Sequence, residues 1–193
     1  MRIIHLSLLL VLLISCEKKI ENTEANFPTP FEISNKTETA TYDQVVEFYL
    51  KLSKEFSSIN IQTIGTTDSG KPLHLVTFNA QGDFNFKKLG EDHTMMLINN
   101  GIHPGESDGV DATMLLFRDL ASKKIKTPNQ TIISTIPIYN IGGALNRNNT
   151  TRANQNGPKE YGFRGNAKNY DLNRDFIKTD TKNAETFSKI YHL

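Results

Sequence analysis

Thr94-Met-Met-Leu-Ile-Asn-Asn-Gly-Ile-His-Pro-Gly-Glu106 carries the strongest structural signal in this chain of 193 residues. Its first six residues are a short apolar run, which is typical of a strand covered on both faces. A second apolar run covers residues 131–139. Between the two runs, apolar residues recur at helical spacing at Val110, Met114, Phe117 and Ala121. Strand, helix and strand in this order predict a right-handed crossover and a parallel pair in an α/β sheet.

The residues before this unit predict one helix and one hairpin. Thr41 and Gln44 have the spacing of a capping box. Apolar residues then follow on one helical face at Val45, Phe48, Tyr49, Leu52 and Phe56. Residues 60–66 and 73–80 are β-branched or alternating runs on either side of a turn, which predicts a hairpin at the sheet edge. The fold class is therefore α/β, with a mixed, largely parallel sheet flanked by helices.

The residues after the second apolar run predict a long loop and a last helix. Residues 140–175 are rich in Asn, Gly and Arg and show no apolar period. A loop of this length in a compact domain is commonly functional. A helix is expected over residues 181–192, with Ala184, Phe187 and Tyr191 on one face. The whole chain has a length suited to one ordinary domain.

The N-terminal residues have the pattern of an export signal. Arg2 precedes an apolar run from Leu6 to Ile14, which is too short to span a bilayer as a permanent helix. The run ends in Leu-Ile-Ser-Cys16, which resembles the lipobox of bacterial lipoproteins, and an ordinary signal peptide is the alternative. We expect a signal peptide over residues 1–15, a lipidated Cys16 and flexible tether over residues 16–35, and a domain over residues 36–193. The expected location is the bacterial cell envelope, where the lipid holds the protein on a membrane face.

Composition narrows the kinds of site that the domain can carry. The 22 Lys and Arg residues nearly balance the 21 Asp and Glu residues, so no global field favours a nucleic acid partner. The single cysteine excludes an internal disulfide and a cysteine-cluster metal site. A metal site in this chain would need His, Asp or Glu ligands.

His103 and Glu106 are the first candidates for such ligands. They lie three residues apart where the first strand of the crossover gives way to its helix, and the crevice beyond the carboxyl ends of strands is where α/β sheets bind ligands. His and Glu together form half of a typical catalytic zinc set. The local pattern equally fits a loop histidine and an acid that is stabilised by the dipole of the following helix.

A second group of polar residues follows at Tyr170-Asp-Leu-Asn-Arg174. Arg174 beside Asn173 offers a guanidinium fork and an amide, which suit bidentate capture of a carboxylate. Asp171 could accept a hydrogen bond from a metal-bound histidine and so orient it. A surface turn with a structural arginine is the alternative.

Four ordered blocks resemble the zinc carboxypeptidase (carboxypeptidase A-like) family. They are residues 65–73 (Gly-Thr-Thr-Asp-Ser-Gly-Lys-Pro-Leu), 100–106 (Asn-Gly-Ile-His-Pro-Gly-Glu), 137–140 (Pro-Ile-Tyr-Asn) and 171–174 (Asp-Leu-Asn-Arg). The resemblance covers about residues 40–193 and implies a carboxypeptidase-like fold, here ending after its first half. It also implies Zn²⁺ as cofactor and a peptide with a free C-terminal carboxylate as substrate.

The resemblance carries over to individual residues. It makes His103 and Glu106 zinc ligands, Asp171 the partner of His103, and Asn173 and Arg174 the grip on the substrate carboxylate. The family also uses an upstream arginine to stabilise the oxyanion. Two arginines fit this role. Arg152 is favoured by its distance from residue 140, and Arg164 is the second candidate. If Arg152 stabilises the oxyanion, Arg164 is assigned to substrate binding.

The remaining parts of the family's site would follow Leu193. They are the third zinc ligand and the general-base glutamate, so these 193 residues alone are expected to bind zinc weakly and to lack peptidase activity. A zinc deacylase of the aspartoacylase or succinylglutamate desuccinylase type is one alternative. A non-catalytic surface lipoprotein that binds peptides is another.

Overall fold

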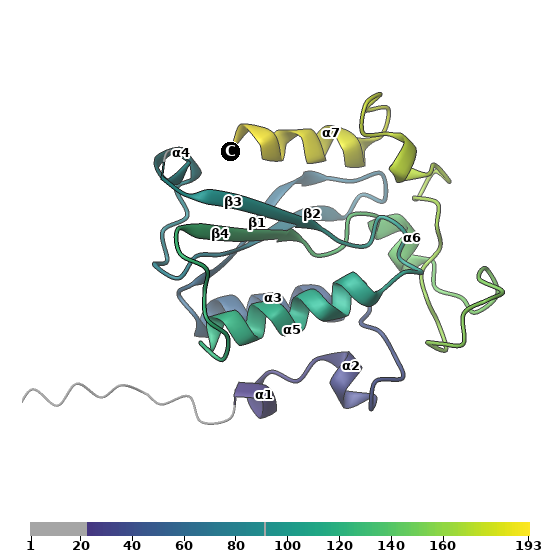
Figure 1. The fold of residues 1–193 in the computed structure, drawn as a ribbon. Helices are drawn as coiled ribbons and strands as arrows, with labels where there is room; N and C mark the ends of the chain where they lie inside the picture. The colour runs from purple at the N-terminus through teal and green to yellow at the C-terminus, as the bar shows by residue number, and fades with distance from the viewer. Residues whose placement is uncertain (1–22, 91) are drawn as a thin grey trace, which may run out of the picture.

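The computed structural model describes residues 23–90 and 92–193 (Figure 1). The predicted signal peptide and the predicted lipidation site at Cys16 lie outside the described residues. Among the helices that are described, none combines the length and the apolar character needed to cross a membrane.

A four-stranded sheet in the order β1-β2-β4-β3 forms the centre of the domain. Its strands are β1 (Ile59–Thr66), β2 (Pro72–Phe78), β3 (Thr94–Asn99) and β4 (Thr131–Ile136). β3 and β4 pair in parallel, as the crossover pattern predicts, whereas β1 with β2 and β2 with β4 pair antiparallel. The predicted mixed sheet is confirmed. Only one of the three described pairs is parallel, so the sheet is less parallel than expected, because the hairpin joins β4 in the antiparallel direction.

Helices cover both faces of this sheet (Figure 1). α3 (Tyr42–Glu55) and α5 (Asp108–Ala121) lie on one face, and α7 (Lys182–Ser188) lies on the other. The predicted capping box at the start of α3 is present, and the predicted apolar face is buried. The rings of Tyr49 and Phe117 meet edge to face with centroids 5.7 Å apart, which joins α3 to α5.

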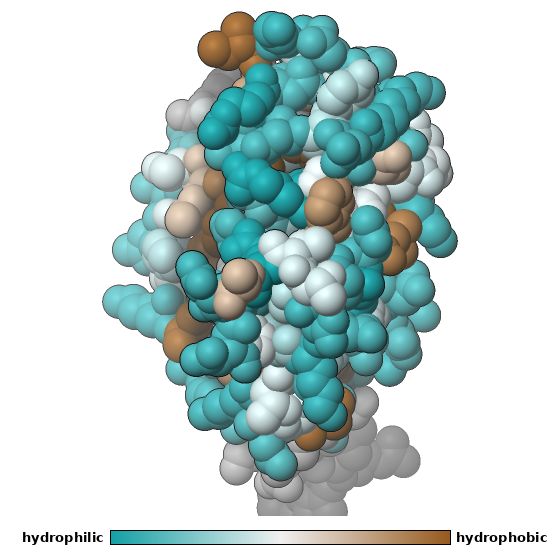
Figure 2. Space-filling view, turned by 90° about the vertical axis from the view of Figure 1, so that its right-hand side faces the viewer, coloured by the Kyte–Doolittle hydropathy of each residue, from teal (hydrophilic) through white to brown (hydrophobic). Residues whose placement is uncertain are grey.

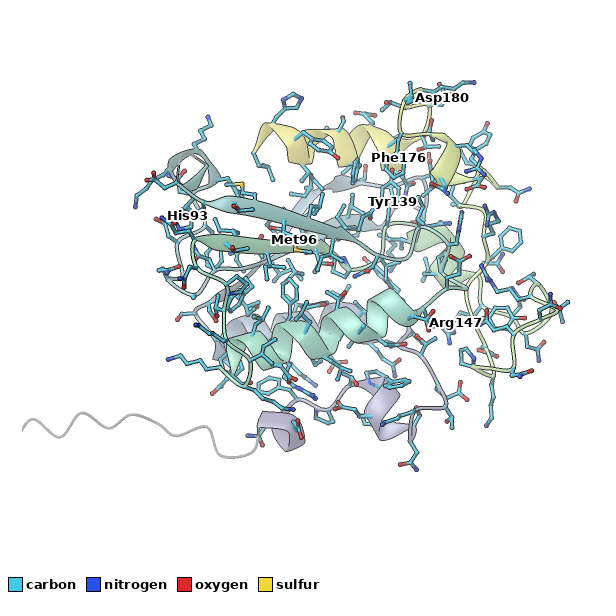
Figure 3. The ribbon with its side chains drawn as sticks, viewed as in Figure 1. His93, Met96, Tyr139, Arg147, Phe176 and Asp180 are labelled. Atoms are coloured by element: carbon cyan, nitrogen blue, oxygen red, sulfur yellow. The ribbon has the colours of Figure 1, made fainter. Side chains whose placement is uncertain are left out.

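α7 approaches β1 closely because residue 65 is a glycine. A Cβ atom at Gly65 would lie 2.9 Å from the side chain of Thr186, whose hydroxyl donates to the Thr66 carbonyl at 2.7 Å. Phe187 of α7 also packs against the rings of Tyr139 and Phe176, which stack on each other with centroids 5.8 Å apart (Figure 3). The predicted last helix is confirmed and ends as the 3-10 turn η2 (Lys189–His192), where Tyr191 contacts Phe187 edge to face but stays 72% exposed.

One turn of helix within the predicted tether contacts the domain. The described part of the tether contains the one-turn helices α1 (Thr23–Asn26) and α2 (Pro30–Ile33). Glu32 closes a capping box with the buried Thr29 and accepts a hydrogen bond from Arg118 Nη1 at 2.7 Å. Arg118 lies in α5 and is 2% exposed, so the contact ties α2 to the domain. Arg118 Nε also donates to Asp119 Oδ1 at 3.2 Å, so the buried guanidinium has a partner within α5 as well.

Three short elements complete the fold. They are α4 (Phe86–Leu89), α6 (Ile141–Leu145) and the 3-10 turn η1 (Leu172–Arg174). The last two lie within the stretch 140–175 that the sequence predicts as loop. α6 contains Gly142 and Gly143, which lower helix propensity, and a Cβ at either position would collide with the later loop residues Ala167 or Phe163. The glycines allow the loop to fold back over α6.

Candidate metal centre

The loop that carries His103 continues the sheet before it turns. Residues on the loop after β4 bond to it through the main chain, since Tyr139 N donates to Asn100 O at 2.8 Å and Asn140 N donates to Gly101 O at 3.0 Å. Gly101 has a φ of 63°, a conformation that glycine adopts without the penalty paid by other residues. These bonds fix the position at which the loop leaves β3.

His103 and Glu106 face each other across a β-turn. Glu106 N donates to His103 O at 2.8 Å, and Pro104 occupies the second turn position, where its fixed φ is favourable. The turn brings His103 Nδ1 to 3.6 Å from Glu106 Oε1. The His103 side chain is 6% exposed and the Glu106 side chain 51% exposed, so the pair opens to solvent on the glutamate side.

Asp171 holds the other nitrogen of the same imidazole. His103 Nε2 lies 2.9 Å from Asp171 Oδ1, which also accepts a hydrogen bond from Asn173 N at 3.0 Å. Because an ionised carboxylate can only accept, this contact assigns the ring proton to Nε2 and leaves the lone pair on Nδ1, the atom that faces Glu106. Burial opposes ionisation of Asp171, but hydrogen bonds from His103, Arg164 and Asn173 outweigh it and lower its pKa to about 2.

Both candidate arginines reach this centre. Arg152 Nη2 lies 2.5 Å from Glu106 Oε1, and this hydrogen bond is the main cause that lowers the pKa of Glu106. Arg164 donates to a single oxygen, Asp171 Oδ2, from both Nε at 3.1 Å and Nη2 at 2.9 Å. Its remaining Nη1 lies 3.2 Å from His103 Nδ1.

Asn173 and Arg174 lie beside the centre without touching the histidine and glutamate. Both are exposed on η1, directly after Asp171. The guanidinium of Arg174 donates from Nη1 to the neighbouring Asn173 carbonyl at 3.0 Å. The pair is thus adjacent to Asp171 and faces solvent, where an external carboxylate can reach it.

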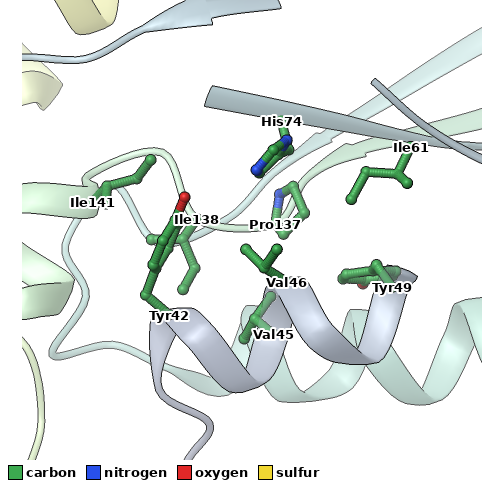
Figure 4. A pocket seen from close by; sticks show the side chains of 9 residues that line it. All are labelled: Tyr42, Val45, Val46, Tyr49, Ile61, His74, Pro137, Ile138 and Ile141. Carbon is green, nitrogen blue, oxygen red and sulfur yellow. The ribbon is translucent and has the colours of Figure 1, made fainter. Parts of the chain in front are cut away.

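A cavity of about 430 Å³ adjoins the centre. Its walls are Thr151, Arg152, Phe163, Arg164, Gly165, Asn169 and Asp171. This volume lies within the usual range for small-ligand sites. A second cavity, between α3 and the sheet (Figure 4), is lined by residues including Tyr49 and His74 and measures about 10 Å³, which is room for one water molecule and not for a substrate.

The surface that carries the long loop is mostly hydrophilic, with scattered hydrophobic residues (Figure 2).

Two buried asparagines organise the site and are missed by the sequence patterns. Asn140 caps α6 by accepting from Gly143 N at 2.8 Å, and its Nδ2 donates to Arg164 O at 2.9 Å and to Ile102 O at 3.3 Å. It therefore joins the loop of His103 to that of Arg164. Asn166 shapes the turn before Asp171. An asparagine directly after a predicted strand is a recognisable helix-capping residue, so the cap at Asn140 could have been predicted. Its bonds to Ile102 and Arg164 could not, because those residues are distant in sequence.

The residues present fit part of a zinc shell. A buried imidazole whose Nδ1 carries the lone pair and a carboxylate oxygen 3.6 Å away are ligands that zinc prefers. The hydrogen bond from Nε2 to Asp171 is the arrangement that fixes a metal-binding histidine. Within residues 23–90 and 92–193, no cluster of three or more His, Cys, Asp or Glu side chains suitable for a metal is found. The described residues therefore offer two ligands.

Comparisons with known proteins agree on one fold. The model of the family described as zinc carboxypeptidase matches residues 45–192. A metallo-carboxypeptidase from Burkholderia cenocepacia has a TM-score of 0.59 at 17% identity, over 80% of this chain and 38% of that one. A putative carboxypeptidase from Burkholderia mallei gives 0.57 at 17%, over 80% and 36%. Carboxypeptidase A from Helicoverpa armigera gives 0.56 at 14%, over 79% and 42%.

Among curated proteins, no match to this chain is found. The chain spans 36% to 42% of the length of the three solved structures above. At these identities the likeness is one of fold.

Proposed function

Because the chain belongs to the zinc carboxypeptidase family, we propose that the protein is a zinc-dependent carboxypeptidase that releases C-terminal residues from peptides. The observation that carries this proposal is the geometry of His103, whose Nε2 is held by Asp171 at 2.9 Å and whose Nδ1 faces Glu106 at 3.6 Å. A histidine whose Nε2 is held by a carboxylate and whose Nδ1 faces a second carboxylate is prepared to bind a cation.

In this proposal, His103 and Glu106 supply two of the zinc ligands. Bound zinc supplies Lewis-acid chemistry that activates water for attack on an amide carbonyl. Asp171 keeps the His103 ring in one orientation and one tautomer. The buried side of the turn excludes water from the imidazole, since His103 is 6% exposed, while Glu106 stays accessible.

We assign the stabilisation of the oxyanion to Arg164 and the positioning of Glu106 to Arg152. The spacing of the family blocks favoured Arg152, but two contacts support the reverse assignment. Arg164 is held by Asp171 through Nε and Nη2, which leaves Nη1 directed at the metal-binding side of His103. Arg152 is instead engaged with the Glu106 carboxylate. A preorganised donor beside the ligands is what oxyanion stabilisation requires.

Asn173 and Arg174 would bind the terminal carboxylate of the substrate. Their exposure and their place directly after Asp171 support this role. Arg174 makes one side-chain hydrogen bond, to a neighbouring carbonyl, so its fork can turn to a carboxylate at little cost.

The test uses the protein expressed from its natural gene. It should contain zinc and hydrolyse short peptides with a free C-terminus, but not the same peptides with a C-terminal amide. His103→Ala should lose zinc and activity, whereas His192→Ala, which changes an exposed histidine of η2, should keep both. Hydrolysis of N-acyl amino acids alone would instead identify a deacylase. Peptide binding without zinc or turnover would identify a binding protein.

Kinetic constants separate the roles of the arginines. Arg164→Ala should lower kcat by about 10²-fold or more with a small change in KM, because an oxyanion donor acts in the transition state. Arg174→Ala should chiefly raise KM. A larger loss of kcat in Arg152→Ala than in Arg164→Ala would reverse the assignment.

We also propose that the mature protein is held on the bacterial cell envelope by a lipid on Cys16. The support is the sequence pattern of residues 1–16. Mass spectrometry of the mature N-terminal peptide should show acyl chains on Cys16, and Cys16→Ser should release the protein from the membrane fraction. An unmodified cysteine in the mature protein would exclude this anchor.

A further inference from the structure

Asp68 is a buried carboxylate at the tip of the β1–β2 hairpin. Turn tips are usually solvated, yet this side chain is 1% exposed. The turn around it is closed by main-chain bonds from Thr67 N to Lys71 O at 3.0 Å and from Gly70 N to Thr67 O at 2.9 Å. A buried charge of this kind needs partners, and none of them comes from the hairpin.

The partners of Asp68 come from the long loop that leads to Asp171. Asn166 Nδ2 donates to Asp68 Oδ2 at 3.0 Å. Lys168 Nζ forms an ion pair with Oδ1 at 2.9 Å, although that oxygen accepts no aligned hydrogen bond. Asp68 N in turn donates to Asn183 Oδ1 at 3.1 Å, so the tip is also fixed to α7. Asp68 is therefore a rigid anchor for a loop that is 98 residues away in sequence.

Asn166 shapes the turn that Asp68 holds. Its Oδ1 accepts from Lys168 N and from Tyr170 N, both at 2.9 Å, and its own N–H donates to Tyr170 O at 2.9 Å. Asn169, within the turn, has a φ of 63°, a conformation that asparagine tolerates better than most residues. Asn166 is 5% exposed. Its side-chain oxygen serves as the acceptor for the N–H groups of Lys168 and Tyr170, which would otherwise need main-chain acceptors.

This turn brings the two ends of a short segment together. Arg164 lies just before it and Asp171 directly after it, and the two side chains pair through Nε and Nη2 of the arginine. Asp171 then holds His103 Nε2. A continuous series of contacts thus runs from Asp68 through Asn166 and the turn to the imidazole.

We propose that Asp68 is a positioning residue, which fixes the turn at residues 166–170 and thereby the orientation of Asp171 and His103. The proposal rests on the proposed function for its catalytic meaning. Its structural part, the orientation of the His103 ring, can be observed without metal or substrate.

The test follows the His103 ring by NMR of the protein with ¹⁵N-labelled histidine. The readouts are the tautomer of the ring, the exchange rate of its Nε2–H, and the hydrogen exchange of the amides at residues 168, 170 and 173. Asp68→Ala should speed these exchanges by about tenfold, as expected for the loss of one buried hydrogen bond, and should mix the tautomers. The hairpin amides of Thr67 and Gly70 should remain protected.

Two control variants separate positioning from charge. Asp68→Asn keeps a side-chain oxygen that can accept from Asn166, and it should restore the wild-type ring signals. Lys168→Ala removes only the exposed partner and should leave the ring unchanged. The proposal is overturned if Asp68→Ala leaves the ring and the 168–173 amides as in wild type, or if Lys168→Ala has the same effect as Asp68→Ala.

The experiment can tell a variant that does not fold, or a protein that is not a peptidase, from an Asp68 that does not position the turn. If Asp68→Ala does not fold, Asn166→Asp removes the donor to Asp68 from the loop side, keeps the side-chain oxygen that accepts from Lys168 N and Tyr170 N, and leaves the hairpin intact. The ring of His103 should then lose its single tautomer, and an unchanged ring would overturn the proposal. A protein without peptidase activity would still give these signals, so the function and the positioning are judged separately.

Discussion

The two loops that form the site are held in different ways. Loop 100–107 extends the sheet, with main-chain bonds from Tyr139 and Asn140 to Asn100 and Gly101, and then enters α5. Loop 146–171 has an isolated β-bridge between Asn148 and Tyr161 and is bonded through the main chain to Gly143 and Pro104, but its segment 164–171 is held to the rest of the domain by side chains such as those of Asn140 and Asn166. The first loop carries the ligands and the second carries the groups that orient them.

The difference shows which part of the site depends on distant residues. Main-chain bonds tolerate many substitutions because every residue offers the same N–H and C=O groups. A bond from a side chain depends on the residue type that supplies that side chain. The conformation of loop 100–107, the ligand loop, should therefore tolerate side-chain substitutions other than those at glycine. The conformation of loop 146–171, the orienting loop, should be sensitive to single substitutions far from the metal centre.

The largest expected effect comes from Asn140, where the two loops meet. Asn140→Ala removes three hydrogen bonds of a fully buried side chain, to Ile102 O, Arg164 O and Gly143 N. We expect the free energy of unfolding to fall by about 3 kcal/mol, measured by urea denaturation. Asn149→Ala, an exposed asparagine of the same long loop, should stay within about 0.5 kcal/mol of wild type. Equal losses in the two variants would mean that Asn140 does not join the loops.

An intermediate effect is expected from Gly101, which tests the main-chain support of the ligand loop. Gly101→Ala places a Cβ 3.3 Å from Ile138 at a φ of 63°. Gly70→Ala has a similar φ of 77° but open space around the new atom. Thermal and urea unfolding should show a loss of about 2 kcal/mol for Gly101→Ala and about 1 kcal/mol for Gly70→Ala. A larger loss at Gly70 would show that packing against Ile138 does not limit the ligand loop.

The smallest expected effect is the pH dependence that Asp171 gives to the orienting loop. Its pKa is about 2 in the folded protein, against an ordinary value of 3.8. A carboxyl whose pKa is lowered by folding stabilises the native state fully above its unfolded pKa and loses that contribution as the pH falls toward the folded pKa. Between about pH 4 and about pH 2 we expect a loss of about 1 kcal/mol, reduced by solvent screening.

Urea unfolding at several pH values measures this loss. Asp171→Asn lacks the titrating group and should therefore show a flatter pH dependence over the same range, which provides the matched control. If both proteins lose stability in parallel, the acid sensitivity of the domain arises elsewhere.

Local patterns predicted the part of the fold that main-chain bonds support. The capping box at Thr41, the two apolar runs and the helical spacing between them all gave elements that the structure contains. The parallel pairing of β3 with β4 followed from their order. The antiparallel pairing of β2 with β4 did not, because strand order within a sheet depends on contacts between distant segments.

The site was predictable only where a motif is contiguous. The turn from His103 to Glu106 and the segment from Asp171 to Arg174 each appear in one short stretch. The pairing of Arg152 with Glu106 spans 46 residues, and that of Asp68 with Asn166 spans 98. These pairings form only when the whole domain is folded, so no local spacing in the sequence predicts them.

The contact between α2 and Arg118 also defines where the folded unit begins. Arg118 donates to Phe27 O at 3.2 Å as well as to Glu32, and its side chain is 3% exposed. A version of the protein shortened to residue 36 would uncover this guanidinium and remove two of its acceptors, leaving Asp119 as its partner. Limited proteolysis should consequently trim the N-terminus no further than Phe27, and recombinant forms intended for study of the domain are best started ahead of that residue.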